Sequence, residues 1–450
     1  MSETSSFRNS DYLGTRHEPR HRVRCAIHGF IVYSDAERSI IDNPLFRRLR
    51  YIRQLALTEL VYPGATHTRF EHSLGVMEMA SRIFDRLASR EGARMEDIFA
   101  EIPELKERTM ARARQVCRLA GLLHDVGHCC FSHAAEKVLH KNSGHESLSI
   151  RIITSPEFLG SEIDREFFPG CSNLVASLIS EPAPQLQILA DIVSGQIDAD
   201  RTDYLLRDSH HCGVDYGRFD YRRLIECLTV WQEQPGRPLE IAIQRDGIHS
   251  FESLILARYQ MNTQVYYHRL RRIYDLYLEK YFQEVQRDNP DRFDSPSKVL
   301  ELNDFRAMVE LMGAAHDPSA TGHQWARRII HRQHHRDVFA LDEKDGPLVL
   351  RKAGIVQKQI REEFSEIEFL EDFPEKMVSI HKIARPSDEA DGRIDFPLID
   401  RGRRSSLGER SQLLERLPGA FRVGYIFADV SDRELRVKIA NRCREIYHTC

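Results

Sequence analysis

The hydrophobic pattern along the chain is mainly that of amphipathic helices. Leu45, Leu49 and Ile52 recur at four- and three-residue spacing, so they share one face of a helix. The same spacing continues over residues 68–92 and again over residues 111–126. Three successive helices, each with one buried face, are therefore predicted in the first third of the chain.

Strand-like alternation is confined to shorter stretches. Residues 239–243 alternate as a strand, and residues 244–247 are typical of the turn that follows one. Beyond residue 346, strand-like runs such as 348–350 alternate with charged helices, which predicts a small α+β lobe. Residues 386–412 are polar and contain Gly, Ser and Arg, so we expect a mobile loop there.

These elements predict one helical core with additions at both ends. We expect a frayed polar tail at residues 1–20, a core over 21–285, a helical extension over 286–345 and the α+β lobe over 346–450. The tail offers too little apolar surface to offset the entropy of ordering it. The predicted fold class is therefore mainly α, with a short β-hairpin and a small α+β C-terminal lobe.

Composition and charge limit the kinds of partner that the protein is expected to bind, and they say less about its fold. The 450 residues carry 64 Lys and Arg against 68 Asp and Glu, a net charge of −4, so a nucleic-acid polymer is not the expected partner. Nine cysteines without a CxxC motif indicate reduced thiols. No apolar run approaches the roughly 18 residues of a membrane span, and the start lacks a signal-peptide core. We expect a soluble cytoplasmic protein that does not bind a membrane.

Candidate chemistry is concentrated in the segment His124-Asp125-Val126-Gly127-His128, at a predicted helix end. A histidine followed by an aspartate offers one imidazole nitrogen and one hard oxygen, which suits Mn, Fe, Zn or Mg. The dipeptide alone is weak evidence, because His316-Asp317 repeats it without further ligands nearby. Between residues 124 and 146, in contrast, five histidines and three carboxylates are gathered.

Two other segments carry side chains that could face the same cavity. Arg69 and His72 are three residues apart and hence neighbours on a predicted helix, although such a pair is more often a solvated surface pair. Asp200, Tyr204 and Asp208 form an i, i+4, i+8 stripe about 12 Å long, which matches the distance from an α-phosphate to the far side of a pentose. Taken alone, an exposed acidic helix explains this stripe equally well.

Taken together and in order, these motifs resemble the HD-domain deoxynucleoside triphosphate (dNTP) triphosphohydrolases. The matching segments are Arg69-Phe70-Glu71-His72, His124 to His128, Phe131-Ser132-His133, His145-Glu146 and Asp200 to Asp208. The resemblance is closest to the bacterial dNTPases and the catalytic domain of the vertebrate sterile-alpha-motif/HD-domain enzyme. It implies an HD-domain helical core and metal-dependent hydrolysis of dNTPs to deoxynucleoside and inorganic triphosphate, with water attacking the α-phosphorus.

The resemblance also implies a role for each matching residue. It gives a divalent metal, one of Mn, Mg, Fe or Zn, held by His72, His124, Asp125 and Asp200. It gives four catalytic residues, namely His128 and His145 as acid/base groups, Glu136 as the carboxylate that orients His145, and Arg69 beside the phosphates. It gives the substrate contacts as Gln54, Leu55, His133, Arg201, Tyr204 and Asp208. Where relatives have a glycine run after Gln54, this chain has Ala56-Leu57-Thr58.

A regulatory site is implied in the same way. Asp42, Arg47 and Arg50 stand where some relatives bind an activating nucleotide between subunits, although Arg47 replaces a glutamine of that pattern. Arg332 and Arg336 are the candidate additions from a basic, histidine-containing stretch. The resemblance therefore implies activation by GTP or a dNTP and a homo-oligomer, either a tetramer or a dimer of dimers.

Two other functions use the same residues differently. An HD-type nucleotidase or a phosphodiesterase would use the same ligands on other nucleotides and release inorganic phosphate or a linear nucleotide. A non-catalytic protein that senses nucleotides or nucleic acid would use the basic segments instead, although such a protein has no need of four metal ligands.

Overall fold

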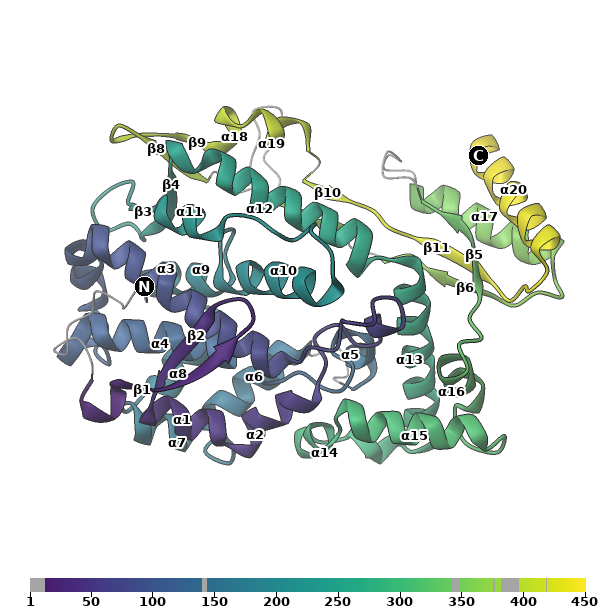
Figure 1. Ribbon diagram of the computed structural model, residues 1–450, viewed down its shortest axis with the longest axis horizontal. Coiled ribbons are helices and arrows are strands. Elements are labelled where there is room, and N and C mark those ends of the chain that lie inside the picture. The colour runs from purple at the N-terminus through teal and green to yellow at the C-terminus, as the bar shows by residue number, and fades with distance from the viewer. Residues whose placement is uncertain (1–12, 140–143, 342–348, 375–376, 382–395, 418) are drawn as a thin grey trace. The chain divides into compact units, whose positions relative to one another are not determined.

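The computed structural model describes residues 13–139, 144–341, 349–374, 377–381, 396–417 and 419–450. The described chain is mainly helical with a few small sheets, which confirms the predicted fold class (Figure 1). The chain forms two compact units, each assembled from three stretches. Unit 1 contains residues 1–258, 293–305 and 382–417, and unit 2 contains residues 259–292, 306–381 and 418–450. The part of the predicted tail at residues 1–12 lies outside the described residues.

After a 3-10 turn (Thr15–His17), unit 1 has a β-hairpin that the hydrophobic pattern did not reveal, and its first strand begins at Pro19, within the tail predicted for residues 1–20. Strand β1 (Pro19–Cys25) pairs antiparallel with β2 (Gly29–Ser34). The hairpin leads into α1 (Asp35–Asp42), where Ser34 and Glu37 form a capping box. Only one position of β1 is fully buried, so its arginine-rich sequence lacks the clear alternation on which strand prediction depends.

The centre of unit 1 is the pair of helices α3 (Arg69–Phe99) and α4 (Thr109–Leu123), both close to their predicted positions. The helices approach closely at Gly121, where an added Cβ would lie 3.1 Å from the backbone oxygen of Val76. The predicted end of the first helix near Glu91 is wrong. Glu91 has a φ of −131° and marks a kink, beyond which the helix continues.

Shorter helices surround this pair. The predicted helix after Pro44 is split into α2 (Pro44–Arg47) and a 3-10 turn (Arg48–Tyr51). The remaining helices of this part are α5 (His133–Leu139), α6 (Gly144–Thr154), α7 (Gly160–Glu166), α8 (Cys171–Ile179), α9 (Gln187–Ser194), α10 (Ala199–Cys212) and α11 (Tyr221–Glu226). Helix α10 packs against α3, which brings the Asp200 segment to the His72 segment.

A four-stranded sheet completes unit 1, with the order β3-β4-β8-β9. Strand β4 (Glu240–Gln244) lies where a strand was predicted, but it pairs with the preceding strand β3 (Leu228–Trp231), which was not predicted. The predicted turn after β4 is a 3-10 turn that leads into α12 (Ile248–Met261). The prediction of a mobile loop at residues 386–412 is wrong for those residues that the structure describes. Residues 396–412 include β8 (Pro397–Asp400) and β9 (Arg403–Ser406), and β8 pairs in parallel with β4. Residues 386–395 lie outside the described residues.

Short helices α14 (Pro296–Glu301), α18 (Leu407–Arg410) and α19 (Gln412–Arg416) also belong to unit 1. Helix α15 (Asp304–His316) begins in unit 1 and continues into unit 2.

Unit 2 has its own hydrophobic core, to which a three-stranded sheet of order β5-β11-β6 contributes side chains. Its strands are β5 (Arg336–Ala340), β6 (Phe369–Asp372) and β11 (Tyr425–Ala428), and β7 (Val378–Ser379) pairs with β10 (Ala420–Phe421). Its helices are α13 (Arg269–Asp288), α16 (His323–Ile330), α17 (Val349–Glu363) and α20 (Arg433–Thr449). Among the described residues of both units, no helix has the length and apolar content to cross a bilayer.

Candidate metal and phosphate site

The four predicted metal ligands lie together in unit 1. One ligand atom from each of His72 on α3, His124 after α4 and Asp200 on α10 falls within 4.8 Å of the others. The closest approach joins His72 Nε2 to Asp200 Oδ1 at 3.2 Å. Asp125 is adjacent, with one carboxylate oxygen 3.4 Å from His124 Nε2 and the other 3.6 Å from His72 Nε2. The four residues come from α3, from the end of α4 and from α10, and they meet at one point. His72 and Asp200 are 128 positions apart in sequence.

Both histidines are oriented by a hydrogen bond from the far ring nitrogen. His124 Nδ1 donates to the backbone oxygen of Gly121 at 2.8 Å, and His72 Nδ1 donates to Asp203 Oδ2 at 2.8 Å. The two Nε2 atoms are buried and make no hydrogen bond of good geometry to another described residue. Two buried imidazole nitrogens facing two carboxylates are the donor set of a divalent cation site, so the residues present fit the metal.

The charges of the site reinforce this arrangement. Burial alone would raise the pKa of the Asp125 carboxyl, but Arg69 and the neighbouring histidines hold it well below its usual range. Burial would likewise lower the pKa of His72, but the neighbouring carboxylates of Asp200 and Asp203 raise it to about 10. A metal bound at His72 would consequently displace a proton.

Arg69 and Ser132 are linked beside this site. Arg69 forms an ion pair with Asp125, and its Nε donates to the Ser132 hydroxyl at 2.8 Å. The Ser132 hydroxyl donates in turn to the backbone oxygen of Arg53 at 2.7 Å. Ser132 thus links the arginine to the segment before α3.

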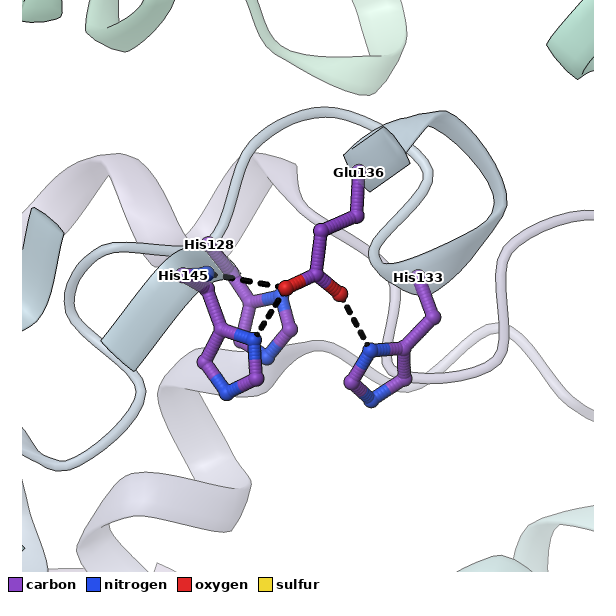
Figure 2. Close-up of side chains that lie close together, drawn as sticks. All are labelled: His128, His133, Glu136 and His145. Atoms are coloured by element: carbon purple, nitrogen blue, oxygen red, sulfur yellow. Dashed lines mark hydrogen bonds and ion pairs between the residues drawn. The ribbon is translucent and has the colours of Figure 1, made fainter. Parts of the chain in front are cut away.

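A second cluster beside the ligands is formed by His128, His133, Glu136 and His145 (Figure 2). Glu136 lies between two rings and accepts from His133 Nδ1 at 2.6 Å and from His145 Nδ1 at 2.7 Å. The His128 ring stacks on the His145 ring with centroids 3.7 Å apart, and His128 Nε2 lies 3.3 Å from Asp125 Oδ1. The cluster therefore adjoins the predicted metal ligands through Asp125.

Burial and neighbouring charges shift the pKa values of His128 and Glu136 for different reasons. Burial, together with the charge of Arg69, lowers the pKa of His128 well below its usual range, so this ring is neutral. Burial would raise the pKa of Glu136, but its hydrogen bonds with His133 and His145 outweigh that effect and keep it ionised. A neutral imidazole beside a carboxylate-bound imidazole can exchange protons with a bound substrate.

The predicted sugar stripe is present on α10, although its residues have protein partners. Asp208 is buried and accepts from His67 Nε2 at 2.7 Å. Arg201 donates through its guanidinium to Asp198 Oδ2 at 2.5 Å. Tyr204 is half-buried one turn from Asp200, and burial raises the pKa of its hydroxyl.

The segment that carries Gln54 and Leu55 precedes α3. The Oε1 atom of Gln54 is buried and has no hydrogen-bond partner among the described residues, whereas Leu55 is fully packed. Ala56 has a φ of 50°, in the left-handed region that glycine tolerates best. Ala56 therefore holds a backbone conformation at this turn that glycine would adopt at lower cost.

Sequence reasoning missed three residues that complete this neighbourhood. Asp203, His28 and Arg207 form a buried network behind His72. Its only sequence signal was the density of charge on α10. Arg258 on α12 was also missed, and its charge acts on Tyr204 and Arg201.

The candidate activator residues are mostly exposed. In unit 1, Asp42 pairs with Arg38 at 3.1 Å, and the guanidinium of Arg50 lies 3.5 Å from the centroid of the Phe70 ring. Arg47 is exposed as well. Arg332 and Arg336 are exposed on unit 2.

Two remaining histidine clusters offer weaker cases for a metal. At His316-Asp317, the carboxylate accepts hydrogen bonds from Ser319 instead. In unit 2, His335, Glu368 and Asp429 lie close together, so the sequence missed two carboxylates near that histidine. The guanidinium of Arg328, however, forms ion pairs with both carboxylates and offsets part of their charge.

Family models match most of this architecture. The model of the HD domain matches residues 69–204, which contain all four predicted metal ligands. The model of the HD associated region matches residues 219–424.

Individual relatives agree with these matches. The uncharacterized protein YwfO of Bacillus subtilis is 38% identical over 54% of this chain and 50% of its own. The deoxynucleoside triphosphate triphosphohydrolase SAMHD1 homolog of Dictyostelium discoideum is 27% identical over 70% of this chain and 59% of its own. A hypothetical protein from Aquifex aeolicus superposes with a TM-score of 0.72, at 26% identity, over 94% of this chain and 99% of its own. The chain spans about half the length of the curated relatives that it matches first.

Proposed function

The chain is an HD-domain protein similar to the dNTP triphosphohydrolases, and on that premise we propose that it hydrolyses dNTPs to deoxynucleoside and inorganic triphosphate. The observation that carries the proposal is the convergence of His72, His124, Asp125 and Asp200, with two buried Nε2 atoms facing two carboxylates. Such a set leaves positions for water and a phosphate oxygen, which hydrolysis requires.

In this proposal the quartet binds one divalent cation, either Mn, Mg, Fe or Zn. The cation would supply Lewis-acid chemistry, neutralising charge at the α-phosphate and lowering the pKa of the attacking water. Arg69, His133 and Arg201 bind the phosphates and stabilise the charge that develops as water adds at phosphorus. Arg69 reaches the phosphates from its position against Asp125, so substrate binding would redistribute that ion pair.

Proton transfer falls to the histidine cluster. His145 or His128 donates a proton to the departing 5′-oxygen of the deoxynucleoside, and Glu136 orients the His145 ring for that step. His128 is neutral and stacked on His145, so it adds no positive charge beside that ring.

The sugar lies along α10 in this account. Tyr204 packs against the pentose, and Asp208 with Gln54 binds the 3′-hydroxyl, while Leu55 closes the pocket beside them. The hydrogen bond from His67 holds the Asp208 carboxylate in place for that contact. Gln54 contributes an amide whose Oε1 has no described protein partner.

A second nucleotide site regulates the activity in this proposal. Asp42, Arg47 and Arg50, with Arg332 and Arg336, bind an activating GTP or dNTP in a homo-oligomer, a tetramer or a dimer of dimers. Linear kinetics in every dNTP mixture, together with an unchanged mass in solution, would contradict this part alone.

Separation of the reaction products tests the proposed activity. The purified chain is incubated with each dNTP and Mn or Mg, and the products are resolved by ion-exchange chromatography. We expect deoxynucleoside and triphosphate in equal amounts, and none with Asp200→Ala. Inorganic phosphate or a linear nucleotide would instead indicate the nucleotidase or phosphodiesterase. Undiminished triphosphate from Asp200→Ala would overturn the assignment of the site.

A further inference from the structure

A buried carboxylate outside the ligand quartet, Asp203, joins the metal site to the N-terminal hairpin. Its Oδ2 accepts from His72 Nδ1 at 2.8 Å, and its Oδ1 accepts from Nε2 of His28 at 2.6 Å. His28 lies in the turn between β1 and β2. The side chains of both Asp203 and His28 are completely buried, so water does not compete for these bonds.

Arg207 holds the same carboxylate from the next turn of α10. Its Nε donates to Oδ2 and its Nη2 to Oδ1, both at 2.8 Å, and its side chain is also completely buried. A bidentate guanidinium fixes both the position and the plane of a carboxylate.

Helix α3 provides space for this carboxylate. A Cβ added at Gly75 would lie 1.9 Å from Asp203 Oδ1 and 2.4 Å from the Nη2 of Arg207, closer than atoms can approach. Gly75 is one turn beyond His72, so the missing side chain allows the Asp203–Arg207 pair to sit directly behind the ligand.

We propose that Asp203 is a positioning residue for the metal ligand His72, and that His28 couples it to the hairpin. The inference rests on the proposed function, because it takes His72 as a ligand. A carboxylate on the far nitrogen of a metal-bound histidine fixes the ring orientation, leaves Nε2 for the metal and makes that nitrogen more basic. The far nitrogen of His124 donates only to a neutral backbone oxygen. Of the two histidine ligands, His72 alone is therefore hydrogen-bonded to a carboxylate.

Calorimetric titration of the full chain with Mn²⁺ tests the inference without relying on activity. For Asp203→Asn we expect a 10- to 100-fold higher Kd, on the order found for such supporting partners. The matched control is Asp85→Asn. Asp85 is on α3, the helix that carries His72, and receives a bidentate pair from Arg114, at 2.6 and 2.8 Å, but touches no ligand. This control should bind Mn²⁺ as the wild type does.

A second pair of variants tests the link to the hairpin. His28→Ala removes a donor to Asp203 and should raise the Kd several-fold, whereas His28→Gln supplies an amide N–H in its place and should restore the affinity. A His28 that serves only to stabilise the hairpin would lower the melting temperature in His28→Ala without changing the Kd.

The outcomes separate this inference from the function on which it rests. If the wild type binds no Mn²⁺, or binds it as tightly after Asp200→Ala, the proposed metal site is wrong. If Asp200→Ala abolishes binding but Asp203→Asn binds as the wild type does, the positioning role alone is wrong. Should Asp203→Asn not fold, equal Kd values for the wild type and His28→Ala would overturn the inference.

Discussion

Glu136 Oε1 accepts two hydrogen bonds from His145, one from the backbone N–H at 2.8 Å and one from ring Nδ1 at 2.7 Å. The carboxylate thereby fixes both the start of α6 and the rotation of the imidazole ring. One face of that ring stacks on His128. A single side chain from α5 thus sets which nitrogen of His145 remains for chemistry.

Replacing Glu136 with glutamine should impair turnover more than binding. The amide still accepts one hydrogen bond, but it carries no charge to support a protonated His145 in the transition state. We expect kcat for triphosphate release to fall roughly 10- to 100-fold with little change in KM. Glu146→Gln is the matched control, because Glu146 is an exposed neighbour on α6. Equal losses in both variants would contradict the role of Glu136.

Asp208→Asn should raise KM for dNTPs. Loss of a charged hydrogen bond to the 3′-hydroxyl costs about 1.5 kcal/mol or more, which corresponds to roughly a tenfold increase. His210, which is exposed two residues before the end of the same helix, is the control, and His210→Ala should leave KM unchanged. Steady-state kinetics on both variants measures the difference. A KM that is unaffected in Asp208→Asn would remove this residue from the substrate site.

The stability of unit 1 should fall in acid because of Glu37. Burial would raise the pKa of this carboxyl, but Arg118, at 2.6 Å, lowers it from its usual 4.5 to about 2. Since the pKa is depressed in the folded chain, the stabilisation is present above pH 4.5 and is lost as the pH falls toward 2. It amounts to about 3 kcal/mol.

Thermal melting at a series of pH values measures this contribution. Glu37→Gln should melt below the wild type at pH 7, because Arg118 is left buried without a counter-ion, and the difference should shrink between pH 4.5 and 2. A difference that stays constant with pH would show that Glu37 contributes through packing alone.

Two glycines on α3 should respond oppositely to alanine. Gly75→Ala places a Cβ 1.9 Å from Asp203 Oδ1, so we expect a loss of roughly 2 kcal/mol or more, together with weaker Mn²⁺ binding. At Gly92 nothing lies within 4 Å of an added Cβ, and alanine should be neutral or stabilising by up to about 1 kcal/mol. Denaturant unfolding compares the two, and equal effects would contradict the close packing at Gly75.

Sequence reasoning selected four candidate ligands that lie together because each belongs to a short motif with metal-binding chemistry. His124 and Asp125 are adjacent, and Asp200 begins a stripe that the helical period exposes. Asp203 was missed because it lies off that stripe, and its function depends on a hairpin 175 residues away in sequence. Spacing along one helix cannot reveal a partner brought in by tertiary packing.

The strands were harder to predict than the helices for a related reason. In β1, the positions between the exposed arginines are mostly only half-buried and include a histidine, so few apolar side chains mark the inner face. After residue 396, β8 pairs with β4 and β9 pairs with β8, so both strands depend on tertiary pairing. A β-strand takes its stability from its neighbours, whereas the buried faces of α3 and α4 are already present in the local pattern.

Hydrolysis in water labelled with heavy oxygen tests the central claim most directly. The proposed attack of water at the α-phosphorus predicts that the label enters the triphosphate and that none enters the deoxynucleoside. The masses of the products formed with Mn²⁺ are measured by mass spectrometry. Label in the deoxynucleoside, or release of labelled inorganic phosphate in place of triphosphate, would contradict the account.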